Sequence, residues 1–167
     1  MDILEGIYTR RSVRQYTNEP VTREQLHEIV KAGMWAPSGL NNQPWRIALV
    51  RSDEVRKKLA KLTKYDFIIE RASACIAVFL DKSAMYHEVK DHLAMGACTQ
   101  NMLLAAHGLG LGAVWLGEIL KNADGVRKLL ELPETMELMA VVAVGHPAEQ
   151  KRTSQRKNLD EVLLKEL

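Results

Sequence analysis

The feature that most constrains this sequence is the long apolar helix predicted for residues 86–107. Small and apolar residues occupy almost every side of its second half, within the run LAMGACTQNMLLAAHGLG. A helix that is apolar all round must be buried, either in a large core or against another subunit. A chain of 167 residues can build one sizeable core but is too short to surround this helix. We therefore expect a single domain, residues 1–167, that forms a homodimer.

The other expected elements alternate between helices and strands. Helices are predicted at residues 3–8, from a Thr22–Gln25 capping box to about Ala36, from Ser52 through Leu62, around residues 126–130, and from about Leu159. Strands are predicted at 45–50, 73–80, 112–116 and 138–145, and the second of these is apolar enough to be buried on both faces. This alternation predicts a mixed α and β fold.

Composition excludes several classes of function. The formal net charge is only +2, so no global field favours nucleic acid or a membrane surface as a partner. No apolar stretch is long enough to span a bilayer, and Met1-Asp2 does not begin a signal peptide. Cys75 and Cys98 lie in apolar runs without metal-ligand spacing, which is typical of reduced core cysteines in a cytoplasmic protein. The scattered histidines form no i,i+4 pair, so we expect no metal site.

Positive charge is concentrated in the segment RRSVRQY, residues 10–16. Arg10, Arg11 and Arg14 lie beside the hydroxyl of Ser12. Such a cluster could form a solvated surface, bind nucleic acid, or bind one small anion with several charges. Guanidinium groups bind phosphate oxygens in a bidentate manner, and a phosphate monoester carries roughly two negative charges near neutral pH. A nucleic-acid interface is the weakest of these hypotheses, because the arginines are few and no aromatic residues lie between them.

A second polar feature is the segment APSGLNNQPW, residues 36–45. Every residue type in it also favours an ordinary turn. However, Ser38, Asn41 and Gln43 place three donors or acceptors in one loop flanked by prolines, and such a loop could contact the polar edge of a planar heterocycle.

The glycine-rich segment GLGLGAVWLG, residues 108–117, is not a dinucleotide fingerprint. That fingerprint requires a strand before the glycines and a helix after them, whereas here the order is reversed. Gly108 and Gly110 are better explained as helix-ending and turn residues, and Gly117 could allow the backbone to approach a ligand. No motif supplies a nucleophile or an evident acid–base pair, so we name no catalytic side chain and expect a cofactor to perform any redox chemistry.

Taken together, these segments resemble the nitroreductase family of FMN-dependent oxidoreductases. The resemblance begins at RRSVRQY, continues through VTREQLHEIVKAGMWAPSGLNNQPWRIALV, and returns at GLGAVWLG, VVAVGHP and QRKNLDEVL. It implies an α+β sandwich with a central, mainly antiparallel sheet flanked by helices. It also implies an interlocked homodimer that binds FMN at the subunit interface.

The resemblance also implies roles for individual residues. Arg10, Arg11, Ser12 and Arg14 would hold the FMN phosphate and reach the flavin, with Arg156 completing the phosphate site. Pro37, Ser38 and Gly39 would line the ring from the partner subunit, and Asn41 and Gln43 would lie near the ring and ribityl chain. Leu116 and Gly117 would offer backbone N–H groups near flavin N5.

The activity implied by the resemblance is electron transfer from NADH or NADPH to a small organic acceptor, of nitroaromatic or quinone type, by a ping-pong mechanism. Two alternatives remain open at this point. One is a specialised branch of the family, such as a dehalogenase, a flavin-fragmenting enzyme or a peptide dehydrogenase. The other is a flavin-binding protein without turnover.

Overall fold

The computed structural model describes residues 2–148 and 153–167 of the chain. Its centre is a four-stranded sheet in the order β1-β2-β4-β3, and every neighbouring pair is antiparallel. The strands are β1 (Trp45–Val50), β2 (Ala74–Asp81), β3 (Gly112–Leu116) and β4 (Met136–Gly145). The expected α+β fold with a mainly antiparallel sheet is therefore confirmed.

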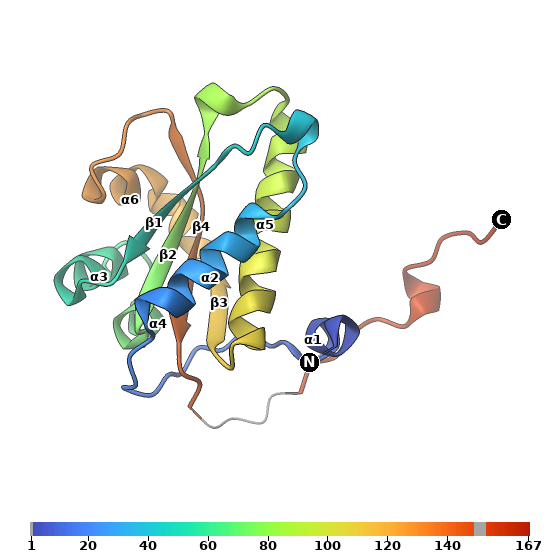
Figure 1. Cartoon of the computed structure of the whole chain (residues 1–167), viewed down its shortest axis with the longest axis horizontal. Coiled ribbons are helices and arrows are strands. Elements are labelled where there is room, and N and C mark those ends of the chain that lie inside the picture. The colour runs from blue at the N-terminus through green and yellow to red at the C-terminus, as the bar shows by residue number, and fades with distance from the viewer. Residues whose placement is uncertain (1, 149–152) are drawn as a thin grey trace.

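Helices cover both faces of the sheet (Figure 1). One face carries α2 (Arg23–Met34) and α5 (Glu88–Gly108). The other carries α3 (Asp53–Ala60), α4 (Asp66–Arg71) and α6 (Ala123–Leu129). The short helix α1 (Ile3–Thr9) lies against the end of α5. Four 3₁₀ segments are η1 (Gly39–Asn41), η2 (Lys82–Ala84), η3 (Glu118–Asn122) and η4 (Leu159–Glu161).

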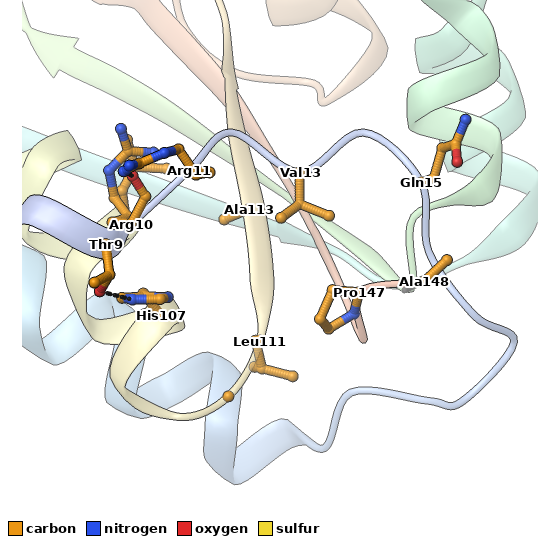
Figure 2. A pocket seen from close by; sticks show the side chains of 12 residues that line it. Thr9, Arg10, Arg11, Val13, Gln15, His107, Leu111, Ala113, Pro147 and Ala148 are labelled. Atoms are coloured by element: carbon orange, nitrogen blue, oxygen red, sulfur yellow. Dashed lines mark hydrogen bonds between the residues drawn. The ribbon is translucent and has the colours of Figure 1, made fainter. Parts of the chain in front are cut away.

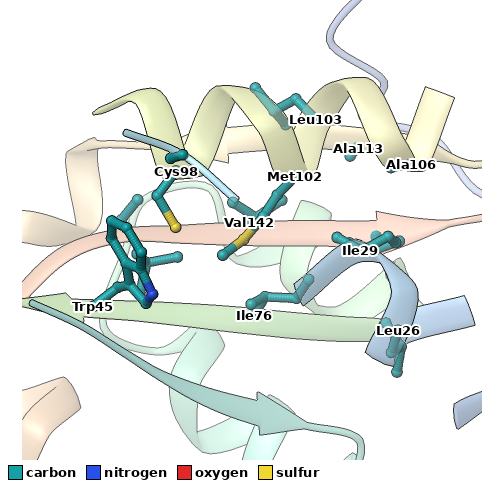
Figure 3. Packing of buried hydrophobic residues seen from close by; sticks show 14 of the residues in the cluster. Leu26, Ile29, Trp45, Ile76, Cys98, Met102, Leu103, Ala106, Ala113 and Val142 are labelled. Atoms are coloured by element: carbon teal, nitrogen blue, oxygen red, sulfur yellow. The ribbon is translucent and has the colours of Figure 1, made fainter. Parts of the chain in front are cut away.

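Strand β2 divides the core into two layers because its side chains alternate between the faces of the sheet. Ile76 and Val78 pack toward α2 and α5, whereas Cys75 and Phe79 pack toward α3, α4 and α6. All eight residues of β2 are buried, which confirms the prediction of a strand buried on both faces. Figure 3 shows the layer beneath α5, where Cys98 and Met102 face the sheet.

Helix α5 is buried on one side only. Met95, Cys98 and Met102 are buried against the sheet, whereas Leu93 is 70% exposed on another side of the helix. Gly96, Ala97 and Ala105 are half-buried. The chain alone therefore leaves part of this apolar helix uncovered.

Local capping signals predict where several of the helices begin. The Thr22–Gln25 capping box forms, and Ser52 accepts a hydrogen bond from the backbone N–H of Val55. The helix after Ser52 ends at Ala60 rather than Leu62, and α4 was not predicted. The short helix predicted near Leu159 begins there, as the three-residue 3₁₀ helix η4.

The C-terminal arm, residues 153–167, is exposed along its whole length. Figure 1 shows it extending away from the sheet and its helices, beyond α1. No helix in residues 2–148 and 153–167 combines the length and the apolar character that a membrane span requires.

Candidate functional site

The segment after α1 carries the positive charge of the site. It crosses β3 through a bridge between Ser12 and Ala113, and the N–H of Val13 donates to the carbonyl of Ala113 at 3.0 Å. Tyr16 then anchors the end of the segment, since its hydroxyl donates to the carbonyls of Val13 and Ala143. The backbone on both sides of Arg14 is therefore fixed to the sheet.

Arg10, Arg11, Arg14 and Arg156 form what we call the arginine cluster. With Ser12, Thr153 and Ser154 they line a cavity of about 300 Å³. The structure thus brings Arg156, from the end of the chain, beside three arginines from its start. Residues 149–152, which precede the arm, lie outside the described residues.

The charge of the arginine cluster is not neutralised within the described part of the chain. None of its four members pairs there with a carboxylate. The buried atoms Arg10 Nη1 and Arg11 Nε have no hydrogen-bond partner among the described residues. Burial, and then the nearby charges of Arg11 and Arg156, lower the pKa of Arg10. The cavity is therefore a concentrated positive site that would bind an anion.

A second cavity, of about 380 Å³, lies on the α5 side of the same segment. Figure 2 shows Arg10 and Arg11 at one end of it and Pro147 and Ala148 at the other. Thr9 Oγ1 and His107 Nε2 lie 2.9 Å apart at its edge, which ties the start of the arginine segment to the last turn of α5.

Residues 37–43, which we call the amide loop, lie elsewhere. The amide loop packs on the first turn of α5, because the side-chain amide of Asn42 donates to Asp91 at 2.7 Å. Asn41 and Gln43 are exposed there. Helix α5 has 21 residues and rises about 30 Å, so the amide loop and the arginine segment are held at opposite ends of one helix.

Leu116 and Gly117 end β3 between these two regions. Leu116 is buried, whereas Gly117 is exposed and a Cβ atom added to it would meet nothing within 4 Å. Its φ of −96° is open to any residue, so neither space nor backbone conformation requires glycine here within the described chain. The backbone of Gly117 is accessible to a ligand.

Sequence reasoning missed two contacts around the candidate site. Asp91 is one of two acidic residues in the first turn of α5, where the helix dipole favours negative charge, and nothing in the sequence distinguishes it. Glu118 accepts hydrogen bonds from the Thr63 hydroxyl at 2.7 Å and from the Lys64 N–H at 3.2 Å, which fixes that turn beside Gly117. No short-range sequence pattern could have revealed contacts across such separations. The described residues contain no group of three or more acidic, cysteine or histidine side chains that could hold a metal ion.

Comparison with known proteins identifies the family of this chain. The sequence profile of the nitroreductase family matches residues 7–74 and 60–146. The chain belongs to the nitroreductase family. It is 38% identical over 153 residues to an NADH dehydrogenase/NAD(P)H nitroreductase of Archaeoglobus fulgidus, a match that covers 90% of this chain and 88% of the relative.

Two further similarities concern flavin. The chain is 30% identical to the FMN reductase [NAD(P)H] of Bacillus subtilis, with 93% of this chain and 70% of the relative covered. It is 50% identical to a nitroreductase from Desulfovibrio desulfuricans whose crystal structure is a complex with FMN. That similarity covers 99% of this chain and 97% of the other, with a TM-score of 0.95.

Proposed function

We propose that the arginine cluster binds the phosphate of FMN and that the amide loop of a second copy lines the flavin ring. The protein is an FMN-dependent NAD(P)H oxidoreductase. One observation carries the phosphate assignment: the arginine cluster combines several guanidinium groups, an unpartnered buried Nη1 atom on Arg10, and no described carboxylate. These residues fit a phosphate monoester, which carries about −1.5 to −2 charges near neutral pH.

The other predicted site residues are assigned to FMN by the same proposal. Ser12 and Arg14 line the arginine cavity, and Arg156 closes it from the arm. Pro37, Ser38, Gly39, Asn41 and Gln43 are proposed to meet the ring and ribityl chain, and the backbone at Leu116 and Gly117 to meet the ring near N5. With FMN held there, the site would have the chemistry for hydride transfer from NADH or NADPH and for electron transfer to a small organic acceptor of nitroaromatic or quinone type. The protein's part in this ping-pong cycle is to bind, orient and shield.

The separation of the two halves supports a site shared between copies. The amide loop and the arginine segment are attached to opposite ends of α5. A second copy related by two-fold symmetry can bring its own amide loop to the arginine cluster of the first, and receive the same in return. We therefore propose a homodimer with two equivalent flavin sites at the interface.

Exposed apolar side chains support the same assembly. Trp35 is 87% exposed and Leu40 is 86% exposed, both at the amide-loop end of the chain. Leu93 on α5 and the arm residues Leu159 and Leu164 are also exposed. Large apolar side chains left in solvent on several elements favour an interface with a second copy, and an obligate dimer buries roughly 2,000 Å² or more. We expect the C-terminal arm to lie on the second copy.

Complementation between two variants tests this arrangement. Arg14→Ala impairs the phosphate half, and Asn41→Ala impairs the ring half. In a mixed dimer of the two, a shared site predicts one site with both defects and one with neither. Half of the sites should then bind FMN with wild-type affinity in a fluorescence titration.

The outcomes of the mixing experiment are distinct. If both halves belonged to one protomer, every site of the mixed dimer would carry one defect and no wild-type affinity would return. Arg23→Ala, which removes an exposed arginine from α2, is the matched charge control and should leave FMN affinity unchanged.

We also propose a cytoplasmic location. The support is that Cys75 and Cys98 are both free and buried, and burial raises the pKa of each thiol to about 12. Such inert thiols are compatible with a reducing compartment.

A further inference from the structure

The amide loop has an unusual backbone. Leu40, Asn41 and Gln43 have φ angles of 54°, 55° and 47°, in the left-handed region that non-glycine residues rarely adopt. Leucine and glutamine gain nothing from this conformation by themselves. A strained segment of this kind persists only where its surroundings hold it, and such strain gathers at functional sites.

Asn42 is the residue through which the loop is held. Its Nδ2 donates to Asp91 Oδ1 at 2.7 Å and to the carbonyl of Ala84 at 3.0 Å. Both partners are acceptors, so the orientation of the amide is determined. Asn42 Oδ1 is buried and has no hydrogen-bond partner in the described part of the chain, so the amide satisfies its acceptors at the cost of its own oxygen.

Asp91 also accepts hydrogen bonds from outside the amide loop. It is fully buried at 0% exposure, and its Oδ2 accepts the backbone N–H groups of Tyr86 and His87, each at 2.9 Å. One carboxylate therefore joins the amide loop, the turn before α5 and the first turn of α5. None of the described basic side chains forms an ion pair with it.

The charge state of Asp91 agrees with this arrangement. Burial alone would raise the pKa of its carboxyl. The hydrogen bonds from the His87 N–H, the Asn42 amide and the Tyr86 N–H, together with the charge of His87, outweigh burial and hold the pKa below its usual range. A buried carboxylate that is held by hydrogen bonds, with no described ion pair, costs more than an apolar residue would, which favours a role for Asp91 beyond the fold.

We propose that Asp91 is a positioning residue for the flavin site, fixing through Asn42 the strained amide loop in the shape that meets the ring. This inference rests on the proposed function. Its specific content is that Asp91 acts on the ring half of the site and leaves the phosphate half unchanged. Riboflavin, which has the ring and ribityl chain of FMN but no phosphate, separates the two halves.

The test compares the affinities for FMN and riboflavin in Asp91→Asn. This isosteric change leaves one oxygen and one NH₂ in place of the two carboxylate oxygens. The remaining oxygen is needed by the N–H groups of Tyr86 and His87, which turns the new NH₂ toward the NH₂ of Asn42, so the charge-assisted bond at 2.7 Å is lost. Affinity for both flavins should fall by the same factor, roughly tenfold or more, as expected for one charge-assisted hydrogen bond. The ratio of the two affinities should stay at the wild-type value, and the visible circular dichroism of the bound flavin should change.

Arg14→Ala provides the contrast, because it should weaken FMN alone and reduce that ratio. Asn42→Ala breaks the same contact from the half-buried loop side and should reproduce Asp91→Asn. Ile69→Val removes one buried methylene on the far face of the sheet and controls for general loss of stability.

Several outcomes would overturn the proposal. The first is that folded Asp91→Asn and Asn42→Ala bind riboflavin with wild-type affinity. The second is that these variants reduce the ratio of FMN affinity to riboflavin affinity, as Arg14→Ala is expected to do. The third is that Ile69→Val loses as much flavin affinity as they do. Failure of both Asp91→Asn and Asn42→Ala to fold would assign the contact to the fold alone and would also overturn it. If wild-type protein bound neither flavin, the proposed function itself would fail, which is a distinguishable result.

Discussion

Thr9 and His107 are 98 positions apart, yet a 2.9 Å hydrogen bond joins Thr9 Oγ1 to His107 Nε2. The Thr9 hydroxyl donates its only proton to the carbonyl of Glu5 at 2.7 Å. The hydroxyl oxygen must therefore accept from His107, so the imidazole carries a proton on Nε2. This contact fixes the residue immediately before Arg10 to the end of α5.

The protonation of His107 should respond to FMN. Burial first, and then the charges of Arg10 and Arg11, lower the pKa of His107, against a weaker opposite effect of Glu5. A bound phosphate offsets the two arginine charges, so this pKa should rise when FMN binds. An NMR titration of the imidazole resonances checks the direction, and an unchanged or lowered pKa would place the phosphate elsewhere.

The same pKa predicts how stability depends on pH without FMN. A histidine whose pKa is lowered by folding contributes stability that is fully present above its unfolded value of about 6.5 and is lost as pH falls through the folded pKa. His107→Gln should remove this part of the dependence. Denaturation curves of both proteins across that pH range measure the difference.

Loss of one arginine should weaken FMN binding without unfolding the chain. Arg10→Ala and Arg14→Ala each remove a charge-assisted contact worth about 1.5–3 kcal/mol, which corresponds to roughly tenfold or more in affinity. Equilibrium dialysis measures the affinity, and far-ultraviolet circular dichroism confirms the fold. Wild-type affinity in both variants would remove them from the phosphate site.

Substitution of Leu40 by glycine tests whether a second copy covers the amide loop. Leu40→Gly removes left-handed strain of about 1–2 kcal/mol, and in the chain alone it loses little because Leu40 is 86% exposed. We expect a second copy to bury Leu40, so burial worth about 1.5–3 kcal/mol should be lost and should outweigh the relief. The thermal midpoint of the dimer should then fall, whereas a rise would mean that Leu40 stays in solvent.

Gly33 sets the distance between α2 and α5. A Cβ atom at this position would lie 2.6 Å from Met102 Cε and 3.1 Å from Cys98 Sγ. Gly33→Ala should therefore reduce the free energy of unfolding by about 1–3 kcal/mol, as overpacking does in buried cores. In a Met102→Ala background the same change should cost much less, and equal costs in a double-mutant cycle would contradict the steric explanation.

Sequence reasoning succeeded where the signal was local. The Thr22–Gln25 box and the Ser52 cap depend on residues three positions apart, and both form as predicted. Helix α4 was missed because its six residues are too few for a clear period, and two of them, Ile68 and Ile69, are held by the core. Long-range packing decides such short elements.

The site shows the same limit. The arginines of residues 10–14 were visible in the sequence, and the resemblance to a family implied that Pro37, Ser38 and Gly39 line the partner's flavin ring, which stays a prediction. The contact of Asp91 with Asn42 joins residues 49 positions apart, and neither residue alone differs from an ordinary cap or turn residue. The proposed role of this contact follows from the burial of Asp91 and from the strained backbone of the amide loop, and both are visible only in the folded chain.

The length of helix α5 sets the distance between the two polar segments attached to its ends. One of its ends holds the segment that carries positive charge and the other holds the polar turn. In the proposed dimer, its 21 residues therefore set the spacing at which two copies align those ends. Adding or removing one helical turn would move the ends by about 5.4 Å and put them out of register in both proposed sites at once. In that dimer, the size of the ligand constrains the length of this helix, as does the core that it covers.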